Sequence, residues 1–190
     1  MHRIAIMIGH AGRGSNMLAL AQNIKSDANM TLATVIAPNM SAPGVIAAQD
    51  LGYPVQHVPY EPKETYTSRL LEALNDVEWV CLAGFMKLVP IVVIQRFRGR
   101  IMNIHPALLP KFGGKGMYGI HVHEAVIQAQ EKESGCTVHH VSEIYDEGEV
   151  ILKATCPVLP EDTPETLAAR VLKLEHLSYF RALQKVIDDE

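Results

Sequence analysis

The stretch "RIAIMIGHAGRGSN", residues 3–16, decides the fold class of this chain of 190 residues. Its apolar run Ile4–Ile8 leads directly into a glycine-rich turn, and a helical pattern begins at Asn16. A nearly all-apolar strand is typical of a sheet whose two faces are both covered by helices. The stretch therefore predicts a strand, a tight turn and a helix, which is the opening unit of an α/β fold.

The same alternation of strand and helix continues along the chain. It predicts an α/β fold with a doubly wound, mostly parallel sheet and helices on both faces. We expect one continuous sheet in a single domain, 1–190, with a nucleotide- and phosphate-binding half at about 1–100 and a catalytic half at about 101–190. The predicted strands are Arg3–Ile8, Thr31–Ala37, Val55–Val58, Trp79–Ala83, Ile101–Ile104, Thr137–Val141 and Val150–Thr155, and the predicted helices are Asn16–Asp27, Pro43–Leu51, Lys63–Asp76, Ile91–Phe97, Val122–Glu131 and Pro164–Ile187.

Two late features differ from this pattern. The last two strands are joined by the acidic turn "IYDEGE", residues 144–149, which predicts a hairpin-like addition to the sheet. The last helix has a clear start, because Asp162 or Thr163 can cap it, Pro164 suits its first turn and Glu165 complements its dipole.

Composition excludes several classes of function. The formal net charge of −4 predicts that the chain binds no nucleic acid. Its three cysteines are widely spaced and include no C-x-x-C pair, which is typical of reduced thiols in a cytoplasmic protein. No apolar run approaches the roughly 18 residues that a membrane span needs. We expect a cytoplasmic protein, a monomer or homodimer, that acts on small molecules and does not bind membranes.

The glycine-rich stretch "GHAGRGSN", residues 9–16, is the first candidate site. Glycines let the backbone approach a ligand, and free N–H groups at a helix N-terminus attract an anion. Ser15 and Asn16 can both cap and donate, and Arg13 adds a positive charge. The stretch matches neither a Walker loop nor G-x-G-x-x-G. It predicts a phosphate site, and a plain turn without a ligand is the alternative.

The stretch "RIMNIHPALLP", residues 100–110, places Asn103 and His105 two residues apart at the end of a strand. Side chains alternate along a strand, so these two point to the same face. An amide can stabilise a developing oxyanion, and an imidazole can move protons near neutral pH. The pair suits attack on a carbonyl by the substrate or by water, because no serine or cysteine lies beside it. A histidine that only bonds the backbone is the alternative.

Asp146 lies in the turn "SEIYDEGEV", residues 142–150. A carboxylate beside a histidine raises the pKa of the imidazole and can hold a water molecule. From local sequence alone, a solvated acidic turn is the stronger interpretation. The second glycine cluster, "FGGKGMYG" at 112–119, reads as a flexible loop that can fold over a ligand.

Four histidines raise the question of a metal site. His121 and His123 flank the predicted start of a helix, and His139 and His140 point to opposite faces of a strand. No cysteine or carboxylate accompanies them at diagnostic spacing. We therefore predict no metal.

Together these motifs resemble the glycinamide ribonucleotide transformylases, which are folate-dependent formyltransferases. The resemblance covers nearly the whole chain, and N-x-H-P-x-L-L-P is quite specific for enzymes that use 10-formyltetrahydrofolate. The motifs, in family order, are "GRGSN" at 12–16, "LAGFMKLVP" at 82–90, "NIHPALLPKF" at 103–112, "GCTVHHV" at 135–141 and "YDEGEVI" at 145–151.

The resemblance implies roles for individual residues. It implies that 10-formyltetrahydrofolate is the co-substrate and that the amine of glycinamide ribonucleotide takes up the formyl group in de novo purine biosynthesis. The implied catalytic residues are Asn103, His105 and Asp146; the implied substrate-binding residues are Gly14, Ser15, Asn16, Leu172, Lys173, Leu174 and Glu175; and the implied folate-binding residues are Lys63, Met86, Lys87, Leu88, Val89, Asn103, Ser142, Glu143, Ile144, Tyr145 and Asp146.

The chain also departs from the family pattern. Its first glycine loop is longer, Lys87 stands where arginine is common, Ala107 stands where serine is common, and "GGKGMYG" replaces a shorter connection. Three other functions stay open. A formyltetrahydrofolate deformylase usually carries an additional N-terminal domain, methionyl-tRNA formyltransferase needs a basic C-terminal domain, and a non-catalytic nucleotide-binding module would not need the three catalytic residue types.

Overall fold

The computed structural model describes residues 1–10 and 12–189; Ala11, within the stretch 9–16, lies outside the described residues. The described residues form seven strands and six helices in the predicted order. The strands are β1 His2–Ile8, β2 Met30–Ala37, β3 Val55–His57, β4 Trp79–Ala83, β5 Ile101–His105, β6 Glu133–His140 and β7 Val150–Pro157. The helices are α1 Ser15–Ser26, α2 Pro43–Asp50, α3 Lys63–Ala73, α4 Ile91–Arg96, α5 Ile120–Gln128 and α6 Pro164–Asp188.

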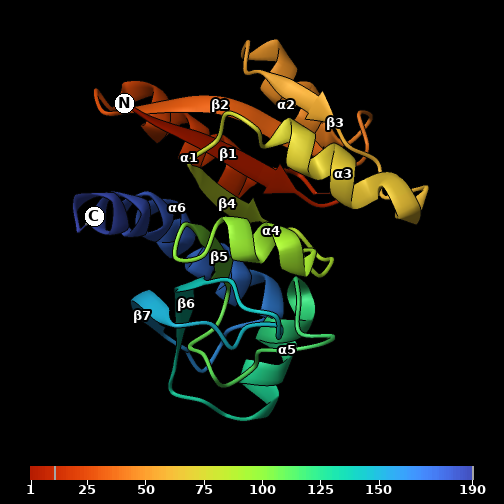
Figure 1. Cartoon of the computed structure of the whole chain (residues 1–190). Coiled ribbons are helices and arrows are strands. Elements are labelled where there is room, and N and C mark those ends of the chain that lie inside the picture. The colour runs from red at the N-terminus through yellow and green to blue at the C-terminus, as the bar shows by residue number, and fades with distance from the viewer. Residues whose placement is uncertain (11, 190) are drawn as a thin grey trace. The chain divides into compact units, whose positions relative to one another are not determined.

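The chain divides into two compact units, Met1–Met102 and Asn103–Glu190. In the first unit, β1 pairs in parallel with β2 and with β4, and β2 pairs in parallel with β3, in the order β3-β2-β1-β4. Helix α1 packs against β1, β2 and α2. Right-handed connections place α3, which returns from β3 to β4, on the opposite face, and Figure 1 shows α3 in front of these strands. The α/β class with a mostly parallel sheet, covered by helices, is therefore confirmed.

The core of the first unit is the apolar stretch with which the chain opens. Every residue of Ile4–Ile8 is at most 1% exposed, and Trp79 on the neighbouring strand is equally buried. In the register, Ile6 lies between Val35 of β2 and Cys81 of β4. A strand with covered faces on both sides buries every side chain, which is why the sequence shows no alternation of polar and apolar residues there.

The second unit contains an antiparallel pair, β6 and β7, against which α6 packs (Figure 1). Thr137 lies opposite Lys153, and the connection between the strands contains the acidic turn, so the predicted hairpin-like addition is confirmed. Helix α6 begins at Pro164 behind the N-cap Thr163, whose hydroxyl accepts from the N–H of Thr166. The predicted cap by Thr163 is therefore confirmed.

Some element boundaries differ from the prediction for local reasons. Strand β6 starts at Glu133, four residues before the predicted start. Glycine weakens a strand pattern, so the sequence around Gly135 gives little sign of a strand. The structure needs glycine there because β7 passes so close that a Cβ would clash with its backbone. Helix α5 ends at Gln128, and Gln130 then takes a left-handed conformation with φ of 53°. None of the helices in the described part of the chain combines the length and apolar composition needed to cross a bilayer.

Candidate active site

The second unit brings Asn103, His105 and Asp146 together. Strand β5 carries the first two, and the turn between β6 and β7 carries Asp146. His105 Nδ1 lies 3.6 Å from Asp146 Oδ2. His139 of β6 completes the cluster, because its Nε2 lies 3.2 Å from Asn103 Nδ2 and 3.6 Å from Asp146 Oδ1. Residues 43 positions apart in the sequence therefore form one group of polar side chains.

Hydrogen bonds to backbone carbonyls orient both imidazoles. His105 Nε2 lies 2.7 Å from the carbonyl oxygen of Phe112, and His139 Nδ1 lies 2.9 Å from that of His140. A carbonyl only accepts, so each of these nitrogens carries hydrogen and donates. In a neutral His139, Nε2 is then bare and accepts a hydrogen bond from the Asn103 amide. That bond orients the amide and leaves its second N–H as a candidate donor to a ligand.

The pKa of His105 lies below the ordinary value for histidine. Burial is the largest cause, because His105 is only 5% exposed and low polarity disfavours the imidazolium. Asp146 and the Phe112 carbonyl act in the opposite direction and raise the pKa, as expected of a neighbouring carboxylate, while His139 lowers it further. The prediction that Asp146 raises the His105 pKa holds for that pair, but burial outweighs it. The neutral imidazole is thus the resting form.

The pKa of Asp146 also lies below its ordinary value. Burial works to raise it, but the His139 and His105 rings, which attract the carboxylate when they carry a proton, and the backbone N–H of Gly114 together outweigh burial. The Gly114 nitrogen lies 2.8 Å from Asp146 Oδ2. The side chain is 11% exposed. It is therefore a largely buried, ionised carboxylate rather than part of a solvated turn.

We predict that the free energy of unfolding falls as the pH is lowered from 7 to 5. The pKa values of His105 and His123 are both lowered by burial in the folded chain, while unfolded histidines titrate near pH ~6.5. Below that pH the unfolded state binds more protons, so stability is lost on acidification. Urea unfolding at the two pH values measures the difference.

A His123→Gln variant should reduce this pH dependence, since it removes one buried imidazole. His121→Gln is the matched control, because His121 lies on the same helix with its side chain 58% exposed. A stability that stays level or increases between pH 7 and 5 would contradict the prediction.

The glycine-rich loop of the first unit opens α1 in a conformation suited to an anion. Gly14 is the N-cap with φ of 75°, a left-handed conformation that favours glycine. A Cβ at Gly14 would lie 2.8 Å from the Cα of Gly44, so the loop passes directly against the start of α2. The first turn of α1 has no acidic residue and no side-chain cap. Its N–H groups are therefore not occupied by a capping side chain.

The expectation that Ser15 and Asn16 cap α1 is wrong, because the helix already begins at Ser15. A residue inside the first turn cannot take the extended conformation from which a cap reaches back. Asn16 Oδ1 is buried without a hydrogen-bond partner among the described residues. Both side chains thus remain candidates for binding a ligand, as predicted for the phosphate site.

The other predicted site residues fall in both units. In the first unit, Lys63 begins α3 and is exposed, and the segment 86–89 between β4 and α4 has three exposed residues followed by the buried Val89. In the second unit, Glu143 and Ile144 are exposed and Ser142 bonds the Ile144 carbonyl at 2.9 Å. On α6, Leu172, Lys173 and Leu174 are partly or fully exposed, and Glu175 is 7% exposed. Their ligand-binding roles stay predictions.

Sequence reasoning missed His139 and Gly44. The histidine pattern suggests only a metal ligand at His139, and the signal that could have found it is its place in the motif "GCTVHHV" at 135–141. Its contact with Asn103 depends on how β5 and β6 are placed, which the local sequence does not contain. Gly44 follows Pro43 at a helix start, a position that gives no sign of the close approach of Gly14.

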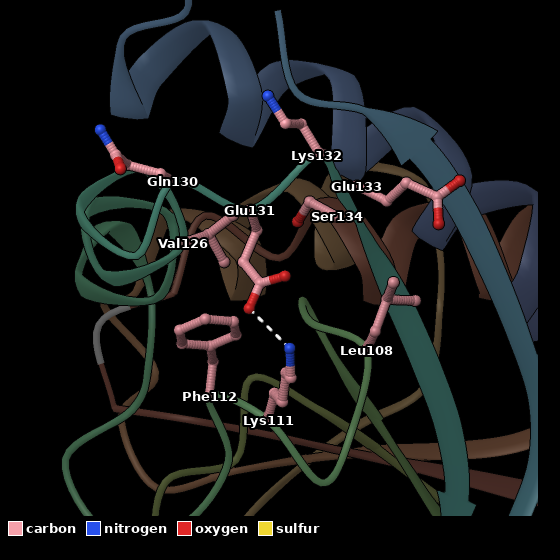
Figure 2. A pocket seen from close by; sticks show the side chains of 9 residues that line it. All are labelled: Leu108, Lys111, Phe112, Val126, Gln130, Glu131, Lys132, Glu133 and Ser134. Carbon is pink, nitrogen blue, oxygen red and sulfur yellow. Dashed lines mark hydrogen bonds and ion pairs between the residues drawn. The ribbon is translucent and has the colours of Figure 1, made fainter.

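A cavity of about 390 Å³ also lies in the second unit (Figure 2). None of the residues predicted for the site lines it. Its walls include Leu108, Phe112, Val126 and Ser134, and the ion pair between Lys111 and Glu131 spans one side at 2.7 Å. Within residues 1–10 and 12–189, no group of three or more histidine, cysteine, aspartate or glutamate side chains is arranged for a metal ion.

Known proteins resemble the chain over nearly its full length. It is 39% identical over 193 residues to the chloroplastic phosphoribosylglycinamide formyltransferase of Vigna unguiculata, covering 98% of this chain and 61% of that protein. It is 39% identical over 189 residues to the trifunctional purine biosynthetic protein adenosine-3 of Drosophila pseudoobscura pseudoobscura. That match covers 95% of this chain and 13% of the relative, so the chain spans only a small part of the trifunctional protein.

Solved structures agree in fold. The phosphoribosylglycinamide formyltransferase of Brucella melitensis is 40% identical with a TM-score of 0.85, and the match covers 97% of this chain and 94% of that one. The enzyme of that name from Anaplasma phagocytophilum is 37% identical with a TM-score of 0.85, covering 99% and 88%. The family model described as Formyl transferase matches residues 2–183. This chain therefore belongs to the formyl transferase family.

Proposed function

We propose that this chain is a phosphoribosylglycinamide formyltransferase, which transfers the formyl group of 10-formyltetrahydrofolate to the amine of glycinamide ribonucleotide. The observation that carries the proposal is the cluster of Asn103, the buried His105 and Asp146, with 3.6 Å between imidazole and carboxylate. The names of the relatives and solved structures support the choice of substrates. In this proposal the folate is a co-substrate, and the chemistry requires no metal.

The proposed reaction is a direct attack of the amine on the formyl carbon. A new C–N bond forms, the carbonyl oxygen becomes an oxyanion, and the bond to folate N10 then breaks. The amine loses a proton and N10 gains one. The free N–H of the Asn103 amide donates to the oxyanion, in the place and polarity that such a charge requires.

His105 and Asp146 manage the protons. A resting neutral imidazole can take a proton from the attacking amine, and the resulting imidazolium is stabilised by the ionised carboxylate 3.6 Å away. Asp146 also holds a water that relays a proton toward N10. Holding the two reactants in line contributes much of the rate, because it replaces a bimolecular encounter by a reaction within one complex.

The glycine-rich loop at the start of α1 binds the ribonucleotide phosphate in this proposal. Gly14, Ser15 and Asn16 supply backbone N–H groups and polar side chains, and Arg13 adds charge. Lys63, the segment 86–89 and the segment 142–146 bind the folate, and 172–175 bind the ribonucleotide. A cytoplasmic location, the monomeric or dimeric state and the absence of nucleic-acid binding stay predictions, and the plant relatives are described as chloroplastic.

The experiment follows the absorbance of 10-formyltetrahydrofolate, or of its stable dideaza analogue, with and without glycinamide ribonucleotide. Formyl transfer that depends on the ribonucleotide is the expected result. Turnover without the ribonucleotide would replace the proposal by a formyltetrahydrofolate deformylase. No turnover in either mixture, with a ribonucleotide-dependent rise in melting temperature, would indicate a binding module without this activity.

A further inference from the structure

Segment 112–114 contacts both His105 and Asp146 through its backbone. The carbonyl oxygen of Phe112 accepts a hydrogen bond from His105 Nε2 at 2.7 Å. Two residues later, the N–H of Gly114 donates to Asp146 Oδ2 at 2.8 Å. One short piece of chain therefore contacts both partners of the imidazole–carboxylate pair.

The Phe112 carbonyl determines which nitrogen of His105 carries hydrogen in the neutral ring. Because Nε2 donates to that carbonyl, the neutral ring leaves Nδ1 bare, and Nδ1 is the atom that faces Asp146 at 3.6 Å. A bare nitrogen and a carboxylate cannot hydrogen-bond. The pair becomes strongly attractive only when Nδ1 takes a proton, which is the state that follows proton transfer from a substrate amine.

The Gly114 N–H holds the oxygen on which this attraction depends. It bonds Oδ2, the same atom that faces His105. Asp146 itself has φ of 58°, an unfavourable value for a residue with a side chain, so the carboxylate is carried on a strained turn. The hydrogen bond from Gly114 gives this side chain a defined position.

The residue types of the segment are those that this arrangement requires. Gly114 has φ of +89°, which a residue with a Cβ rarely adopts. A Cβ at Gly113 would lie 3.2 Å from Asp146 Cβ and would push the carboxylate away. Phe112 has φ of 57°, and its ring lies in the wall of the cavity beside the Lys111–Glu131 ion pair (Figure 2).

We propose that the backbone of Phe112–Gly114 is a clamp that positions the catalytic pair, with Phe112 and Gly114 as positioning residues for His105 and Asp146. The proposal rests on the proposed function and deepens it. It assigns a role to the start of the glycine-rich stretch 112–119, in which the chain departs from the shorter connection of the family.

The test compares Gly114→Ala with Gly116→Ala. The two glycines have φ of +89° and +90°, and a Cβ at either meets nothing within 4 Å, so the two variants introduce the same backbone strain. Only Gly114 bonds Asp146. We expect kcat/KM of Gly114→Ala to fall about 10- to 100-fold through misplacement of the pair, while Gly116→Ala stays close to the unmodified protein.

The pH profile separates positioning from a general structural effect. The titratable groups that act on His105 are Asp146, His139 on β6 and His123 on α5. The neutral imidazole is the base in the proposed mechanism, so the acid limb of kcat/KM follows the His105 pKa. Displacement of the carboxylate lowers that pKa, and the acid limb therefore moves to lower pH in Gly114→Ala and not in Gly116→Ala. Equal losses in both variants, or an unmoved acid limb in Gly114→Ala, would overturn the clamp.

A second measurement does not require enzymatic activity, so it tests the clamp independently of the proposed function. NMR measures the titration of the His105 imidazole, whose signal is assigned by its absence from the spectrum of His105→Ala. The titration midpoint should lie at lower pH in Gly114→Ala, because the carboxylate is displaced. If the unmodified protein transfers no formyl group, the proposed function fails, and this titration still decides the clamp. An unchanged titration would overturn it.

If Gly114→Ala fails to fold by circular dichroism, Gly113→Ala replaces it. Gly113 is not in a left-handed conformation, and its new Cβ would meet Asp146 Cβ at 3.2 Å and the mobile end of Leu109 at 2.5 Å. The same fall in kcat/KM and the same shifts are expected. A Gly113→Ala protein with the unmodified pH profile and imidazole titration would overturn the proposal.

Discussion

Replacement of His105 by alanine is expected to lower kcat by about 10²- to 10⁴-fold, the usual contribution of a positioned general acid–base. The imidazole is 5% exposed and lies 3.6 Å from the Asp146 carboxylate, so bulk water cannot readily take its place. KM for glycinamide ribonucleotide should change far less, because the proposed role concerns proton transfer rather than binding. Steady-state kinetics of formyl transfer measure both constants.

His121→Ala is the control for this variant. His121 belongs to the same unit, is paired with Glu124 at 3.0 Å and is exposed, so its loss should leave kcat unchanged. Asp146→Asn retains the shape of the carboxylate and removes its charge. If the two groups act as one unit, the double variant should lose little more than His105→Ala alone. Undiminished turnover of His105→Ala would refute the proposed mechanism.

Replacement of Gly135 by alanine is expected to destabilise the chain by about 3 kcal/mol, at the upper end of the cost of overpacking. A Cβ at this position would lie 1.9 Å from the carbonyl oxygen of Ala154 on β7. The clash is with backbone, so only a shift of β7 against β6 can relieve it. The same shift would disturb the strand that carries His139. Urea unfolding measures the loss.

Gly12→Ala is the matched control. The backbone at Gly12 is not left-handed, and the nearest atom to a new Cβ is 3.8 Å away. It should therefore change stability by less than about 0.5 kcal/mol, as surface substitutions usually do. A Gly135→Ala protein as stable as this control would show that the two strands adjust more easily than their register indicates.

The local sequence predicted the elements well because their signals are local. The buried run Ile4–Ile8, the glycine turn after it and the cap at Thr163 each depend on residues within a few positions of one another. The placement of Asn103 and His105 on one face of β5 follows from the period of a strand. Because these signals are local, the predicted boundary is wrong at the start of β6, where a contact with another strand decides where the element begins.

Asp146 shows where local reasoning ends. Its sequence surroundings are acidic and polar, and taken alone they predict a solvated turn. Pairing of β6 with β7 instead sets this turn beside His105 and His139, where the carboxylate is 11% exposed. Only the resemblance of longer motifs to a family points to Asp146, because it compares several separated segments of the chain at once.

The sequence by itself determined the α/β class, the order of the strands and helices, and the chemical types available for catalysis. The tertiary structure decided the pKa balance of His105, where burial exceeds the effect of Asp146, and it identified His139 and segment 112–114 as partners of the pair. The physical reason is the distance along the chain over which each interaction acts. Backbone propensity and side-chain period act over a few residues, whereas burial and hydrogen bonds between distant residues exist only once the chain has folded.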